Sequence, residues 1–278
     1  MRIIITSIFL FIILPLSAAP GDQAGPLLRT NWKQTAPYNI YCPDATLAGC
    51  VAIAMAQTMN YHKYPVHGIG TNSYKWNKTT LTADFEGTRY RWDEMDTDST
   101  AAAELIYHCG VSVWMDYGTG FSGSSEYYAK SALVDFFGYD ENIRMVPRNK
   151  YSDEEWIELL MEQIDDSLPV IYSSGAHTFV VDGYKADGSF HANMGYGYTT
   201  ADSYYKLDEL GSKKTSTALI NIKPDANAYP ELSDIKSVTQ DDIPCNSDNI
   251  MYNIMGLPVC NPIPGQLYII KGKKYLFR

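Results

Sequence analysis

Residues 50–62 form an apolar stretch that begins directly after Gly49. Its alanine and methionine content favours a helix. Because the stretch is apolar on nearly every face, we expect this helix to be buried. Tyr64-Pro65 ends it, since proline disfavours helical geometry in the residue before it.

Three further segments predict helices, at residues 101–109, 126–137 and 153–165. The last one opens with Ser152 and carries a glutamate three residues later, which is a capping box. Between the first two, residues 111–115 alternate between apolar and polar and predict a strand. The first half of the chain is therefore expected to be mainly helical.

The pattern changes after residue 169, where short apolar segments alternate with Gly, Asp and Asn turns. These segments predict strands at residues 170–172, 177–184, 189–193, 203–207 and 218–222. Helices followed by a run of antiparallel strands predict an α+β domain of two lobes, which we place at residues 28–224. Active sites in such folds often lie in the cleft between the lobes.

Residues 1–19 predict a secretory signal peptide, with one positive charge at Arg2, an apolar stretch and small residues after it. The apolar part is too short for a membrane-spanning helix, and no second segment of the chain is long enough. The protein is therefore expected to be secreted or held at the cell surface without a membrane span.

Residues 225–278 predict a linker and short β segments in a piece too small to bury a core of its own. The tail resembles the C-terminal segments that some exported bacterial proteins use for sorting or attachment. That resemblance implies a secretion or surface-attachment machinery as a partner. The alternative is a β-hairpin packed on the main domain and closed by a Cys245–Cys260 disulfide.

Composition narrows the function classes. The net charge is −10 and the 22 Lys and Arg residues are scattered, whereas nucleic-acid binding needs a basic stripe. The 22 tyrosines suit a groove that binds extended peptide, or equally a loop-rich extracellular surface. Five cysteines leave at least one unpaired within the chain. An unpaired thiol in an oxidising compartment is a liability unless it has a function.

Cys50 is the candidate nucleophile because it stands at the start of the predicted buried helix. The positive end of the helix dipole favours the thiolate over the thiol. The backbone N–H of Cys50 is among the unpaired donors of the first turn, so it can bind an oxyanion. The alternative is a buried structural cysteine, which is common beside apolar residues.

A thiolate nucleophile needs a base, and His177 is the best candidate. His62 lies twelve residues after Cys50 on the same helix, about 18 Å away. His177 begins a predicted strand in the other lobe, after small residues that include Gly175 and allow a substrate backbone to approach. The alternative is a histidine at a strand end, satisfied by solvent.

Asn193 is the candidate that orients the base. A loop symmetric about Lys185 places Asn193 opposite His177, where its amide would hold the productive tautomer. A tight turn at Asp187-Gly188 would shift that register. His191, two residues before Asn193, is the rival base, but its position leaves no separate orienting residue.

Four motifs carry a family resemblance: GCVA at residues 49–52, NYHKYP at 60–65, GAHTFVVDGY at 175–184 and FHANMGYG at 190–197. They resemble the streptopain family of papain-fold cysteine peptidases, over residues 31–224. The resemblance implies a papain-like two-lobed fold. No metal or cofactor is expected, because no cluster of Cys and His has the spacing of metal ligands. The resemblance also implies Cys50 as nucleophile, His177 as general base and Asn193 as orienting residue. Tyr196 takes the place of a family tryptophan that covers the His–Asn pair, and we expect it to bind substrate together with Gly175.

One departure puts the level of activity in question. The family usually carries a glutamine six residues before the nucleophile as an oxyanion donor, and this chain has Asp44 there. A carboxylate would repel the oxyanion, and Gln34 is the nearest upstream amide in a family-like setting that could replace the donor. Two functions follow: a secreted endopeptidase acting on protein or peptide, or a catalytically weak papain-fold protein that binds peptide or a surface ligand.

Overall fold

The computed structural model describes residues 23–197, 200–225 and 227–228, together with five short strands of the C-terminal segment. The predicted signal peptide lies outside these residues. In the part of the chain that the structure describes, no helix is long and apolar enough to cross a membrane.

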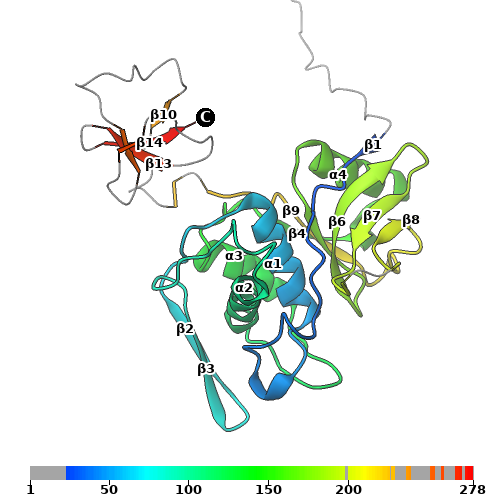
Figure 1. The fold of residues 1–278 in the computed structure, drawn as a ribbon. Coiled ribbons are helices and arrows are strands. Elements are labelled where there is room, and N and C mark those ends of the chain that lie inside the picture. The colour runs from blue at the N-terminus through cyan, green and yellow to red at the C-terminus, as the bar shows by residue number, and fades with distance from the viewer. Residues whose placement is uncertain are drawn as a thin grey trace, which may run out of the picture.

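The first lobe is built on three helices, α1 (Cys50–His62), α2 (Ser99–Ser112) and α3 (Glu126–Asp135). As the sequence predicts, α1 is buried on all sides, from Val51 to Met59. A hairpin of β2 (Thr71–Trp76) and β3 (Thr79–Asp84) extends from this lobe (Figure 1) and was not expected from the sequence.

The strand predicted at residues 111–115 is wrong, because α2 continues through Gly110 and ends at its C-cap, Val113. A Cβ atom at position 110 would clash with the hydroxyl of Tyr117. The glycine therefore serves close packing inside the helix and does not end it, and Val111 and Ser112 belong to the last helical turn.

The second lobe is an antiparallel sheet of seven strands. Five of them follow the predicted segments to within a few residues, and the strands at residues 23–24 and 144–147 were not expected from the sequence. Its order is β4-β9-β5-β6-β7-β8, with the short β1 paired to β6. The strands are β1 (Gln23–Ala24), β4 (Arg144–Pro147), β5 (Val170–Ser173), β6 (Thr178–Lys185), β7 (Phe190–Asn193), β8 (Ser203–Tyr205) and β9 (Thr217–Ile220).

Both faces of this sheet are buried. Ile171, Val180 and Leu219 belong to the core of the helical lobe, where α1 packs against β6. The neighbouring residues along the same strands pack under α4 (Asp153–Asp165), which begins with the predicted capping box between Ser152 and Glu155. The α+β architecture predicted from the sequence is confirmed, and it packs α1 of the first lobe against β6 of the second.

The C-terminal segment forms a second sheet of five strands, more than the two short β segments predicted. Its order is β10-β14-β13-β11-β12, with β10 parallel to β14 and the other pairs antiparallel. The strands are β10 (Lys236–Val238), β11 (Met251–Asn253), β12 (Pro258–Val259), β13 (Leu267–Ile270) and β14 (Lys273–Phe277). Cys245 and Cys260 lie outside the described residues, so their disulfide stays a prediction.

Candidate active site

Cys50 is the first residue of α1, and Gly49 is its N-cap. Gly49 has φ 90° and ψ 137°, a conformation that side chains rarely adopt, and a Cβ atom there would clash with Met115. No side chain caps this end of the helix. The thiol and the backbone N–H of Cys50 therefore stand together at the positive end of the helix dipole.

The loop before Cys50 is held by backbone hydrogen bonds from both sides. Ala48 N–H donates to the carbonyl of Gln34 at 2.9 Å, and Leu47 N–H donates to that of Gly118 at 3.0 Å. These bonds fix the chain that leads into the helix, so the partly buried Cys50 is presented in a defined position.

His177 meets Cys50 from the other lobe. Its side chain hydrogen-bonds to the Cys50 thiol, and its Nε2 lies 2.8 Å from the carbonyl oxygen of Met194. The ring stacks on Tyr196, with centroids 4.7 Å apart and planes 15° apart, and lies 6.0 Å from Phe179 on a second side. Since Nε2 is bonded to Met194, the nitrogen left to face the sulfur is Nδ1.

The two side chains shift each other's ionisation. Burial raises the pKa of the Cys50 thiol. Hydrogen bonds from His177 and Thr178 and the charge of His177 lower this pKa by more than burial raises it, so that it lies below 9.0. Burial lowers the pKa of His177, but its bonds to Cys50 and Met194 and the thiolate charge raise it above 6.5 overall. These opposite shifts both favour the thiolate–imidazolium pair over the neutral thiol and imidazole.

The other described cysteines do not share this environment. Burial raises the pKa of Cys42 to about 12, and it raises that of Cys109, which is fully buried, as well. All three described cysteines are free thiols. Only Cys50 among them is shifted toward the thiolate, which is the form that reacts.

Asn193 lies beside the pair but is not bonded to His177. The register pairs Asn193 with Val180, so the predicted position opposite His177 is wrong. The cause is the tight turn at Asp187-Gly188 that the sequence left open, in which the Lys185 N–H donates to the Ser189 carbonyl; the bulge between Val181 and Gly183 moves the pairing by one residue only. The side-chain oxygen of Asn193 (Oδ1) accepts from the side-chain amide of Gln57 at 2.9 Å and from the backbone N–H of Gly195 at 3.1 Å. Its amide donates to the Thr30 carbonyl at 2.8 Å.

Sequence reasoning missed Gln57 and Met194 as neighbours of the site. Gln57 is completely buried in the middle of α1, and a fully buried amide inside an apolar helix is the one signal that pointed to it. Met194 contributes its backbone carbonyl, which carries no signal in the residue type.

We expect Asn193→Ala to act mainly on stability. The change leaves the Gln57 amide and the Thr30 carbonyl without their partner in a buried place, which costs about 2 to 4 kcal/mol of unfolding free energy. Urea denaturation measures that loss. The change also frees the Gly195 N–H, which shares its peptide unit with the Met194 carbonyl, so the pH range of Cys50 alkylation, measured where both proteins are folded, is expected to narrow slightly. An unchanged profile would show that this bond only stabilises the fold.

His191, the rival base, has a different partner. Its Nδ1 lies 2.6 Å from a carboxylate oxygen of Asp182, which is completely buried and also accepts from the Leu28 N–H at 2.8 Å. The structure therefore pairs His191 with Asp182, and pairs Cys50 with His177.

Asp44 lies in the short turn of residues Pro43–Ala45, with φ 51°, and its side chain is exposed. The turn is held by Thr46, whose hydroxyl and N–H both donate to the Pro43 carbonyl. The charge that acts on Cys50 comes from His177. The repulsion expected from the sequence therefore has no geometric support.

We expect Asp44→Gln to change kcat by less than about threefold, since solvent screens an exposed carboxylate. Initial rates on a peptide substrate measure this. A rise in kcat of tenfold or more would mean that the side chain does face the oxyanion.

Gly175 and Tyr196, the residues predicted to bind substrate, are both exposed beside His177. Gly175 has φ 90°, and a Cβ atom there would lie 2.9 Å from Thr215. Tyr196 is 46% exposed although its ring covers the imidazole. The Thr215 hydroxyl donates to the Ser174 carbonyl at 3.1 Å, so the loop that carries Thr215 borders this surface.

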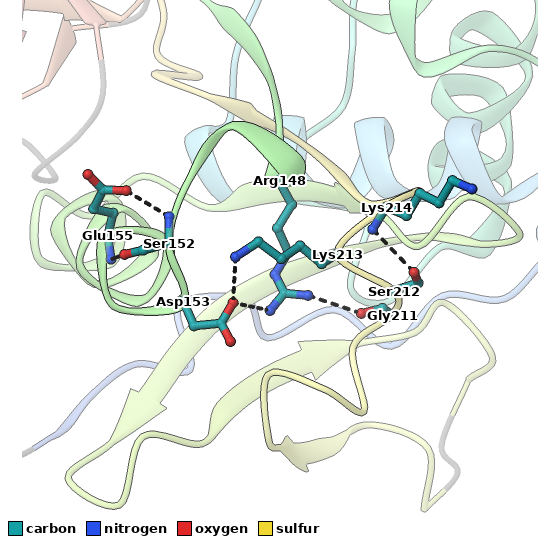
Figure 2. A network of polar contacts seen from close by, with 8 residues as sticks. All are labelled: Arg148, Ser152, Asp153, Glu155, Gly211, Ser212, Lys213 and Lys214. Carbon is teal, nitrogen blue, oxygen red and sulfur yellow. Dashed lines mark hydrogen bonds and ion pairs between the residues drawn. The ribbon is translucent and has the colours of Figure 1, made fainter.

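That loop is fastened by a buried arginine. Figure 2 shows Arg148 between Asp153 and the loop: its guanidinium donates to Asp153 at 3.0 Å and to the Gly211 carbonyl at 3.5 Å. Its backbone N–H donates to the Ser216 carbonyl at 3.0 Å. Lys213 reaches the same Asp153 at 3.2 Å. The border of the surface at Gly175 is thus tied to the start of α4.

Comparisons with known proteins agree with this geometry. The family model described as "Peptidase C10 family" matches residues 32–205. Streptopain of Streptococcus pyogenes is 28% identical over 243 residues, and the thiol protease/hemagglutinin PrtT of Porphyromonas gingivalis is 28% identical over 263 residues. The matches cover 70% and 81% of this chain, but 60% of streptopain and 30% of PrtT.

Solved structures give the same result for the fold. The active interpain A cysteine protease of Prevotella intermedia is 31% identical, with a TM-score of 0.65, over 71% of this chain and 94% of that one. A prointerpain A fragment, residues 39–359, is 29% identical, with a TM-score of 0.68, over 73% of both chains. The papain-like fold is therefore shared with proteins of similar sequence.

Proposed function

The chain belongs to the peptidase C10 family, and we propose that it is a cysteine endopeptidase that hydrolyses extended protein or peptide chains. The observation that carries the proposal is the hydrogen-bonded pair of Cys50 and His177, with pKa values shifted toward thiolate and imidazolium. The chain spans about 60% of the length of the streptopain relatives it matches, so the proposal concerns this chain and its own residues.

In the proposed acylation step, the Cys50 thiolate attacks the carbonyl carbon of the substrate. The carbonyl oxygen gains the negative charge, and the free N–H groups at the start of α1 stabilise it, the Cys50 N–H first among them. As the C–N bond breaks, the imidazolium gives its Nδ1 proton to the leaving amine. The product of this step is a thioester on Cys50 and a free peptide amine.

In the proposed deacylation step, neutral His177 takes a proton from water, which attacks the thioester carbonyl. The tetrahedral intermediate collapses to a carboxylic acid and restores the thiolate–imidazolium pair. The bond from His177 Nε2 to the Met194 carbonyl holds the ring in one orientation through both steps. In this proposal Asn193 acts indirectly, by supporting the peptides that follow it.

Gln34 is the candidate for a second oxyanion donor. Its carbonyl accepts from the Ala48 N–H, two residues before the nucleophile. The preceding residue, Lys33, forms a β-bridge with Tyr196, whose ring covers His177. The segment of Lys33 and Gln34 is thus bonded both to the chain that leads into Cys50 and to Tyr196, which covers His177.

Gly175 and Tyr196 are proposed to form the substrate surface. A glycine without a side chain lets an extended backbone approach, and an exposed aromatic ring offers contact area at low entropy cost. The proposed location is outside the cell or on its surface, supported by the signal-like residues 1–19. The segment of residues 225–278 is proposed to engage a secretion or attachment machinery.

The test is hydrolysis of denatured casein by the full chain under reducing conditions. We expect cleavage that stops when iodoacetamide has reacted with one thiol per molecule. A protein that binds casein without cutting it would instead support the alternative of a peptide-binding protein on the same fold.

A further inference from the structure

Met194, whose carbonyl binds His177, is held at its N–H by a residue with no assigned role. The Met194 carbonyl accepts from His177 Nε2 at 2.8 Å, and the Met194 N–H donates to a carboxylate oxygen of Asp202 at 2.7 Å. We infer that Asp202 is a positioning residue for the catalytic histidine. This inference rests on the proposed function, because it concerns the orientation of the proposed base.

Met194 needs such a support because the sheet does not supply one. β7 ends at Asn193, so the Met194 peptide lies outside the strand ladder. Gly195 follows with φ 69° and Gly197 with φ 80°, and glycines allow the chain many other conformations. Asn193 fixes the peptide after Met194, through the Gly195 N–H, and Asp202 fixes Met194 itself.

Asp202 and Asn193 hold the two peptide units on either side of the Met194 Cα. The Met194 carbonyl shares its unit with the Gly195 N–H, which donates to the Asn193 side-chain oxygen, whereas the Met194 N–H belongs to the preceding unit, which Asp202 holds. Loss of the Asp202 bond lets the chain turn at Met194, so its carbonyl no longer meets His177 Nε2 in one fixed position. Asp202 thus acts on the base without touching it.

The surroundings of Asp202 do not explain it as a stabilising group. It is half-buried, and its second carboxylate oxygen is buried with no hydrogen-bond partner among the described residues. Burial raises its pKa and so does the nearby Asp182 on β6, while the Met194 N–H and His191 on β7 lower it. Placing a carboxylate there costs free energy, and a gain in the geometry of the site would account for the cost.

The experiment compares Asp202→Ala with Asp202→Asn, which keeps an oxygen able to accept from the Met194 N–H. We expect Asp202→Ala to lower kcat on a peptide substrate about 10- to 100-fold with KM within twofold, as a misplaced base does. Asp202→Asn is expected to keep kcat within about fivefold of wild type. Asp187→Ala is the matched control, since Asp187 accepts from the Ser189 N–H at 3.0 Å in the turn at the far end of β6.

The decisive readout is the pH dependence of Cys50 alkylation by iodoacetamide. If Asp202 supports the base, Asp202→Ala lowers the pKa of His177 and raises that of Cys50. The thiolate–imidazolium window, which is the pH range between these two pKa values, then narrows at both ends by about half a pH unit or more. A residue that only stabilises the fold would lower the melting temperature and leave both limbs in place. An unchanged window in folded Asp202→Ala overturns the inference.

Two further variants separate failure to fold from failure of the proposed function. If Asp202→Ala does not fold, Asp202→Glu takes its place, because the longer side chain moves the carboxylate by one methylene and is expected to narrow the window in the same direction. If Cys50→Ala retains activity, the proposed function itself fails. Loss of activity in Cys50→Ala with wild-type behaviour of the Asp202 variants rejects the positioning role alone.

Discussion

Cys50→Ala is expected to lose all hydrolysis of denatured casein while the protein stays folded. The change removes the atom that forms the acyl-enzyme, and the remaining N–H donors offer no other route through a thioester. Alanine suits the first turn of a helix, and Cys50 is only partly buried, so the melting temperature should stay within a few degrees of wild type. Release of acid-soluble peptides measures activity, and circular dichroism measures the fold.

Cys42→Ala is the matched control for this variant. Cys42 is a buried free thiol eight residues earlier in the chain, with a pKa raised to about 12 by burial. Its loss removes a thiol without removing the nucleophile, so the folded protein should keep its activity. Casein cleavage by Cys50→Ala at more than a trace level would refute the nucleophile assignment.

His177→Ala should lower kcat by about a thousandfold or more, because both the acid and the base of the proposed steps are lost. It should also change the thiol itself. Against the effect of burial, the pKa of Cys50 is brought below 9.0 first by His177 and then by Thr178, so without the imidazolium this pKa rises. Alkylation at pH 7 becomes slow and recovers only as the pH rises.

The pH dependence of wild-type activity follows from the same pair, Cys50 and His177. Below the lowered pKa of Cys50 the thiol is protonated, and above the raised pKa of His177 the imidazolium is lost, so kcat/KM is bell-shaped between these limits. His67→Ala is the control, since the His67 ring bonds to the neighbouring Gly68 carbonyl. A His177→Ala protein with an unshifted alkylation profile would mean that another group activates Cys50.

Much of the fold could be predicted from the sequence, because the pattern of each segment favours the element that the whole fold requires at that place. The apolar helix after Gly49, the capping box at Ser152 and the run of strands after residue 169 each specify an element, and their order specifies the lobes. Gly110 misled the prediction because a glycine inside a helix and one that ends it look alike, and only the packing of Tyr117 separates them.

The sequence allowed the catalytic side chains of the site to be predicted, but not the backbone groups that hold them. Cys50 and His177 are the residue types that the chemistry requires, and the structure brings them together. The partner of the His177 Nε2 is the Met194 carbonyl, and every residue has a carbonyl. The tight turn at Asp187-Gly188 sets the register of Asn193, and the sequence was compatible both with this turn and with a longer loop.

The most direct test of the account is the mass of the protein after reaction with one equivalent of an epoxysuccinyl peptide at pH 7. This probe needs both an activated thiolate and a surface that holds an extended peptide. We predict a single adduct, located at Cys50 by peptide mapping, with casein hydrolysis lost in proportion to labelling. Labelling at Cys42 or Cys109, or full hydrolysis by the labelled protein, would contradict the account.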